Sequence, residues 1–73
     1  MVMRMMEYVK RIRSLREEKE ATQLEVANYL QTSQTMYARY EKGNNEMPIR
    51  HLISLSKFYG VSTDYILGLT NKR

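Results

Sequence analysis

Apolar side chains recur along the chain at a helical spacing, and this pattern predicts five short helices. The expected helices cover Tyr8–Lys19, Gln23–Leu30, Gln34–Lys42, Ile49–Tyr59 and Ser62–Leu67. Residues three and four apart fall on one side of a helix, so an apolar stripe at this spacing marks a buried face. The stripes place the following residues in the core: Val9, Ile12, Leu15, Leu24, Val26, Ala27, Leu30, Leu52, Ile53, Leu55 and Phe58. No segment alternates with a period of two, so we expect an all-α fold.

Capping residues mark where these helices begin and end. Thr22 and Glu25 form a T-x-x-E capping box, and Ser33 and Ser62 are good N-caps for the helices that follow them. Glycine directly follows three of the predicted helices, at the position where a left-handed C-cap is needed: Gly43, Gly60 and Gly68. These signals mark six of the helix boundaries independently of the apolar pattern.

The length of 73 residues allows one domain. We expect this domain to span residues 7–69, with a flexible N-terminal extension at residues 1–6 and a short tail at residues 70–73. No apolar run approaches the roughly 20 residues that a membrane span needs. The methionine-rich start also lacks the apolar core of a signal peptide.

The composition favours a polyanionic partner. Lys and Arg number 12 against 8 for Asp and Glu, which gives a net charge of +4. This surplus suits nucleic acid, although plain solubility explains it equally well. Cysteine is absent, which excludes disulfides and fits the cytoplasm, where we expect the protein to act. His51 is the only histidine, so we expect no metal site and no cofactor, and we place His51 partly exposed on the fourth helix.

The second and third predicted helices have the layout of a helix-turn-helix unit, because about three residues join them. Ala27 supplies the small residue that a close helix crossing needs. Small, polar and cationic residues fall within an arc of roughly 140° on the third helix; they are Gln34, Thr35, Ala38, Arg39 and Lys42. A solvated helix face would look similar, but the capped helix and the short turn before it favour a helix that reads DNA.

These side chains suit the edges of base pairs in a major groove. The Gln34 amide can pair with adenine through two hydrogen bonds, and the Arg39 guanidinium can pair with guanine in the same way. Ala38 allows close approach or contact with a thymine methyl group. The third helix therefore predicts sequence-specific binding of double-stranded DNA.

Arg16 lies on the apolar side of the first helix, which is costly for an unpaired charge. Glu41 lies on the core-facing half of the third helix and could pair with Arg16. Alternatively, the Arg16 side chain could extend over its neighbours to reach water. Spacing alone favours neither arrangement.

Two separate blocks of the sequence resemble the Cro/CI-type (XRE) helix-turn-helix family, which includes small phage repressors. The first block is Thr22–Leu30, followed by residues 33–35 and 40–43, and the second block is Phe58–Gly68. The resemblance covers almost the whole chain. It implies a compact five-helix, lambda-repressor-like domain.

The resemblance also implies roles for individual residues. The residues expected to contact bases are Gln34, Thr35, Ala38 and Arg39. The residues expected to contact phosphates are Gln23, Lys42, Asn44 and Asn45. Gln23 would also brace Gln34. Arg16 and Glu41 match a structural ion pair of phage repressors in the family.

The chain departs from the family pattern at three positions. Gln31 stands in the turn where many members have glycine, so the turn conformation is expected to cost free energy. Tyr37 stands where Ile or Val is usual, and we expect the core to hold this ring together with Tyr40. Ser56 stands where alanine is common. None of these changes removes a residue expected to face DNA.

Together these features predict a transcriptional regulator that alters transcription by occupying or exposing a promoter, with repression favoured over activation. We expect two copies to bind a palindrome, because one helix-turn-helix unit buries little surface. The apolar candidates for the dimer contact are Tyr65, Leu67 and Leu69. A restriction–modification controller, an antitoxin with a protein partner, and a protein-interaction module that keeps only the fold are the alternatives. We expect no enzyme, no small-molecule ligand and no membrane contact, since the chain has neither a nucleophile–base pair nor a phosphate loop.

Overall fold

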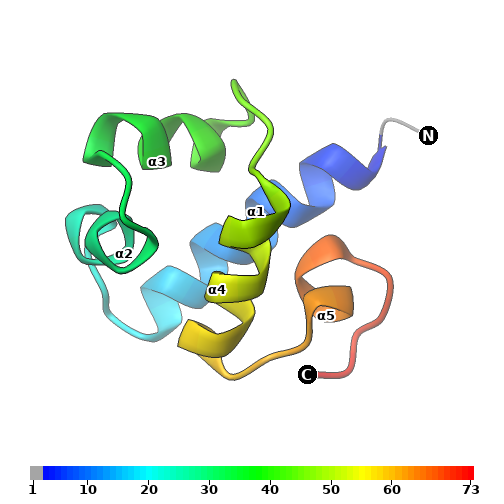
Figure 1. Ribbon diagram of the computed structural model, residues 1–73. Coiled ribbons are helices and arrows are strands. Elements are labelled where there is room, and N and C mark those ends of the chain that lie inside the picture. The colour runs from blue at the N-terminus through cyan, green and yellow to red at the C-terminus, as the bar shows by residue number, and fades with distance from the viewer. Residues whose placement is uncertain (1–2) are drawn as a thin grey trace.

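Five α-helices follow one another through residues 3–73, the part of the chain that the computed structural model describes (Figure 1). They are α1 (Met3–Glu18), α2 (Gln23–Leu30), α3 (Gln34–Lys42), α4 (Ile49–Tyr59) and α5 (Thr63–Leu67). No strand occurs among these residues, so the prediction of an all-α fold is confirmed. None of the described helices is long and apolar enough to cross a membrane.

The first helix begins earlier than the sequence predicts, at Met3 rather than Tyr8. The first seven residues include no Pro, Gly, Ser, Thr, Asp or Asn that would stop the helix or cap it at Tyr8. Methionine and arginine are good helix formers, so the helix continues back through them. Residues 1 and 2 of the expected flexible extension lie outside the described residues.

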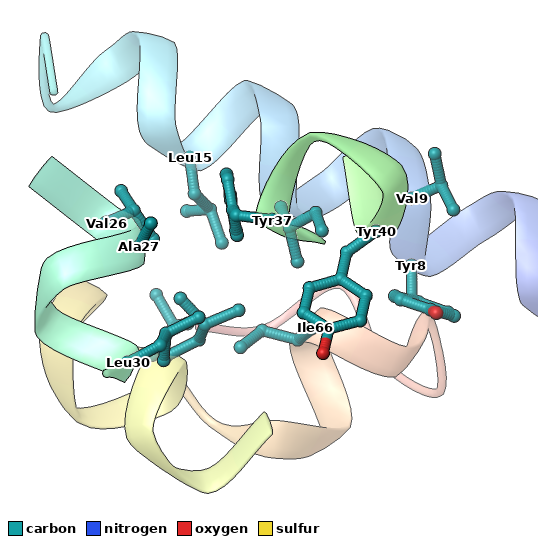
Figure 2. Packing of buried hydrophobic residues seen from close by; sticks show 12 residues of the cluster. Tyr8, Val9, Leu15, Val26, Ala27, Leu30, Tyr37, Tyr40 and Ile66 are labelled. Carbon is teal, nitrogen blue, oxygen red and sulfur yellow. The ribbon is translucent and has the colours of Figure 1, made fainter. Parts of the chain in front are cut away.

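The core collects side chains from all five helices. Figure 2 shows Leu15 of α1 pointing into the interior near Val26 and Ala27 of α2, and Tyr8 of α1 on the side of Tyr40 of α3. The residues with the largest fully buried side chains are Tyr37, Ile12, Leu55, Ile66 and Val26. Tyr37 and Tyr40 are buried as predicted, and their rings meet edge to face at 6.4 Å between centroids. The bulky tyrosine at position 37 is therefore a central part of the core.

Three predicted burial states are wrong, and helical geometry explains each of them. Leu24 is exposed because it lies about a third of a turn away from the buried side of α2. On α4, Ile53 is exposed because it is two residues from Leu55 and points away from it. His51 is buried because it is four residues before Leu55 and shares its side of the helix. The prediction for α4 followed the apolar character of the residues rather than their angular positions.

The end of the chain lies along α1. The Arg11 guanidinium donates to the carbonyl oxygens of Tyr65 and Thr70 and to Asn71 Oδ1, each at 2.9 Å. Arg73 forms an ion pair at 2.8 Å with Glu18, which lies further along α1. The sequence pattern did not single out Arg11, yet it holds both α5 and the expected tail against α1.

Candidate nucleic-acid interface

A three-residue turn joins α2 and α3 and sets their relative orientation. Gln31 takes the left-handed conformation at φ 62°, and the Thr32 amide donates to the Ala27 carbonyl oxygen at 2.9 Å. Ser33 then caps α3, its hydroxyl accepting a hydrogen bond from the Met36 amide. Ala27 is completely buried, as expected of the small residue at a close helix crossing. The left-handed turn that the sequence predicts at Gln31 is therefore present, with a non-glycine residue in it.

The outer side of α3 is free of contacts with the other helices. Figure 1 shows α3 at one edge of the molecule, with no other ribbon beyond it. An open hollow on this side is lined by Gln34, Thr35, Ala38, Arg39, Lys42 and Asn44. All of these residues are exposed except Ala38, which is half-buried. The structure thus brings together every residue predicted to contact bases, together with Lys42 and Asn44 from the predicted phosphate set.

An ion pair fixes the inner side of α3. Arg16 Nε donates to Glu41 Oε2 at 2.7 Å, and Arg16 Nη2 donates to Glu41 Oε1 at 3.1 Å. The Glu41 side chain is only 4% exposed. Arg16 also donates to the Ala21 carbonyl oxygen at 3.1 Å. Of the two arrangements that spacing left open for Arg16, the structure has the paired one.

Gln23 joins this pair. Its amide nitrogen donates to Glu41 Oε1 at 3.2 Å, so one carboxylate connects α1, the start of α2 and α3. The resemblance instead implied that Gln23 would brace Gln34, and the sequence pattern gave no sign of the hydrogen bond to Glu41. Helical periodicity gives the face on which a residue lies but not its partner on another helix. Only the packing of α2 against α3 brings Gln23 and Glu41 together.

The surroundings of Glu41 keep it ionised. Burial by itself would raise the pKa of this carboxyl group, but the Arg16 guanidinium, the nearby Tyr37 hydroxyl and the Gln23 amide together outweigh burial and lower it. Burial raises the pKa of Tyr37, and it raises the pKa of Tyr59 to about 12. The Tyr37 and Tyr59 hydroxyl groups are buried without a partner in good hydrogen-bond geometry. The Glu41 carboxylate is therefore the charged group that accepts hydrogen bonds from Arg16 and Gln23.

The loop after α3 returns to the helix it has just left. Asn45 Oδ1 accepts a hydrogen bond from Arg39 Nε at 2.7 Å. The resemblance implied a phosphate contact for Asn45, and the sequence pattern gave no sign of its hydrogen bond with Arg39. Asn44, its neighbour, is exposed and lines the hollow beside α3. Among the described residues, no group of three His, Cys, Asp or Glu side chains could hold a metal ion.

Comparison with protein families agrees with this geometry. The family model of the helix-turn-helix domain matches residues 9–72. The chain belongs to the helix-turn-helix domain family. The matched residues include the α2–α3 unit and extend through α5 to the segment that lies along α1.

Curated relatives of this helix-turn-helix domain are transcriptional regulators rather than enzymes. An uncharacterized HTH-type transcriptional regulator of Bacillus subtilis, YobD, is 36% identical over 88% of the chain and 57% of its own length. The transcriptional repressor RstR of the cryptic phage CTXphi in Vibrio cholerae is 41% identical over 70% of the chain and 46% of its own length. An SPbeta prophage-derived regulator of B. subtilis, YonR, is 34% identical over 84% of the chain and 56% of its own length. The chain thus spans about half the length of these relatives.

Proposed function

We propose that this protein binds double-stranded DNA in a sequence-specific manner and represses transcription by occupying a promoter. The observation that carries this proposal is the outer side of α3, where amide, hydroxyl and guanidinium groups line one open hollow. Such a helix fits a major groove, in which each base pair presents a distinct set of donors and acceptors. The Arg16–Glu41 pair supports the proposal because it holds α3 rigidly from its inner side.

Contacts to base edges and contacts to phosphates would contribute differently to DNA binding. Contacts to base edges would provide sequence preference; we assign hydrogen bonds to Gln34, Thr35 and Arg39 and an apolar contact to Ala38. Contacts to phosphates would provide most of the affinity; we assign them to Lys42 and Asn44, which line the same hollow, and to Gln23. The sequence also predicts a phosphate contact for Asn45, but its side-chain oxygen accepts a hydrogen bond from Arg39. Gln23 is half-buried and bonded to Glu41, so any contact it makes uses the part of the side chain left exposed.

We also propose that two copies bind one palindrome with half-sites about 34 Å apart. A dimer needs exposed apolar surface. Leu69 is 57% exposed, and α4 adds Ile49, which is 74% exposed. Tyr65 is less available than the sequence suggests, because Arg11 and Arg73 cover its ring at 4.4 and 5.2 Å from the centroid.

Selection of bound duplexes from a random DNA pool at low ionic strength tests the proposal. We expect enrichment of a two-fold symmetric sequence, and sedimentation of the complex should show two protein chains on each duplex. A protein that keeps only the fold, or that binds a protein partner instead, would enrich no sequence. One chain on each selected duplex would contradict the dimer but not the DNA binding.

A pair of matched variants shows whether α3 makes the contact. The variant Gln34→Ala/Arg39→Ala removes one amide and one guanidinium from the outer side of α3. The control Arg13→Ala/Ser14→Ala removes one guanidinium and one hydroxyl from the exposed side of α1. We expect the first variant to lose the sequence preference, about 1–3 kcal/mol for each base pair read, and the control to keep it. If both variants lost sequence preference equally, the contact with bases would not be made by the outer side of α3.

A further inference from the structure

We propose that Asn45 is a positioning residue for sequence reading: it holds the Arg39 side chain in place before DNA arrives. This inference rests on the proposed function, because it concerns how Arg39 meets a base. Its basis is the hydrogen bond of 2.7 Å from Arg39 Nε to Asn45 Oδ1. Asn45 would then affect sequence preference through Arg39, without its own contact to a base or a phosphate.

The C-cap of α3 brings the two residues together. Gly43 takes the left-handed conformation at φ 78°. The Gly43 amide donates to the Tyr40 carbonyl oxygen at 3.1 Å, and the Asn44 amide donates to the Arg39 carbonyl oxygen at 3.0 Å. This pair of bonds reverses the chain at the end of a helix. The next residue, Asn45, therefore returns beside the helical turn that carries Arg39.

The hydrogen bond determines which part of the guanidinium is available. A guanidinium carries five N–H groups, and the bond to Asn45 uses the one on Nε. The four N–H groups on the two terminal nitrogens remain, and one from each nitrogen can meet O6 and N7 of guanine end-on. Long arginine side chains lose conformational freedom on binding, so holding Arg39 in advance reduces that cost.

An amide is suited to this position because it is neutral. A carboxylate at position 45 would hold Arg39 as firmly, but it would offset the positive charge of Arg39 and repel the phosphates nearby. Asn44 offers a natural comparison. It is also an asparagine on the same loop, it is exposed, and its backbone amide rather than its side chain bonds to Arg39.

A double-mutant cycle tests the proposal. The proteins are wild type, Asn45→Ala, Arg39→Ala and the double variant, with Asn44→Ala as the matched control. Each protein is titrated with two duplexes. The first is the selected duplex, and the second carries another base in place of the guanine that wild type prefers and Arg39→Ala does not. We expect Asn45→Ala to weaken binding to the selected duplex about fivefold in the wild-type background and to have no effect once Arg39 is absent. Asn44→Ala should act equally in both backgrounds.

Additive losses in the cycle would overturn the role of Asn45 while leaving DNA binding intact. They would show that Asn45 contacts the duplex directly. Failure of the wild-type protein to select any duplex would instead overturn the proposed function itself. A measurement without DNA separates these cases: the Arg39 Nε–H NMR signal of the free protein should shift and exchange faster with water in Asn45→Ala but not in Asn44→Ala. An unchanged signal would show that the hydrogen bond does not hold Arg39 in solution.

Discussion

At the scale of single residues, the Arg16–Glu41 pair connects α3 to α1 through a buried carboxylate. Truncating one partner leaves a buried charge unpaired, which costs far more than the loss of an exposed ion pair. We therefore expect Glu41→Ala to lower the free energy of unfolding by about 3–5 kcal/mol in urea denaturation. Gln23 would also lose its acceptor in this variant.

An exposed ion pair on α1, the helix that carries Arg16, provides the control. Arg13 and Glu17 are paired at 3.2 Å, with side chains that are 65% and 57% exposed. Glu17→Ala should change stability by less than about 1 kcal/mol, because water screens this pair. Similar losses for Glu41→Ala and Glu17→Ala would contradict the burial of the Arg16–Glu41 pair.

Two buried groups make the fold sensitive to acid in separate ranges of pH. Burial lowers the pKa of His51 below its ordinary value of 6.5, with Arg50 adding to the effect, so the unfolded chain takes up a proton first as the pH falls. The pKa of Glu41 lies below its ordinary value of 4.5, so the unfolded state again binds protons more readily. Stability should therefore fall below pH 6.5 through His51 and fall further below pH 4.5 through Glu41.

Variants assign each part of this pH dependence. Melting curves between pH 7 and 3 should show a flatter slope below pH 6.5 for His51→Phe, which keeps a ring against Tyr40. Glu41→Gln should flatten the slope below pH 4.5, although it is less stable throughout. If His51→Phe kept the wild-type slope, His51 would not be the source of the loss of stability below pH 6.5.

At the scale of elements, the turn between α2 and α3 contains a residue that disfavours its own conformation. A left-handed backbone at a residue with a side chain costs about 1–2 kcal/mol, and Gln31 adopts it at φ 62°. We expect Gln31→Gly to raise the free energy of unfolding by about 1 kcal/mol, after part of the gain is offset by the greater freedom of glycine when unfolded. Thermal or urea denaturation would measure the change.

The opposite substitution at the end of α3 is the control. Gly43 is left-handed at φ 78°, a backbone conformation that a side chain strains, while a Cβ there would make only an ordinary contact with Val9. Gly43→Ala should therefore destabilise the protein. If both substitutions acted in the same direction, backbone strain would not be the explanation at Gln31.

The sequence predicts helix boundaries well where it contains a specific signal and poorly where it does not. Thr22, Ser33 and Ser62 cap their helices as expected, because a side-chain oxygen satisfies a free backbone amide at each site. The start of α1 was missed because no residue near Tyr8 stops or caps a helix. On α4, Ile53 and His51 were misplaced because residue type outweighed angular position in the prediction.

At the scale of the whole molecule, Arg11 connects parts of the chain that periodicity cannot relate. Its guanidinium binds carbonyl oxygens of α5 and of the final residues, 54 and 59 positions away. The hollow residues Gln34, Thr35, Ala38, Arg39 and Lys42 could be predicted from helical spacing, because they lie on one face of α3. The partners of Gln23, Asn45 and Arg11 could not, because each depends on how separate segments pack or turn.

Removing the Arg11 guanidinium should loosen this connection. Arg11→Met keeps much of the side-chain length but loses the three hydrogen bonds to α5 and the final residues, together with the ion pair to Glu7 on α1. We expect a loss of about 1–3 kcal/mol in the free energy of unfolding, with faster hydrogen exchange at the amides of α5. Lys10→Ala, which removes a cation from the adjacent exposed position, is the control. Unchanged exchange in α5 would show that apolar packing alone retains that helix.

The anchored end of the chain has a practical consequence for measuring DNA binding. Figure 1 places the C-terminus at the opposite end of the view from α3, and the Arg73–Glu18 pair keeps it beside α1. A fluorophore, affinity tag or surface linker attached after Arg73 would therefore start away from the helix that we expect to meet a duplex. Immobilisation through this end should leave the measured affinity equal to that of the free protein.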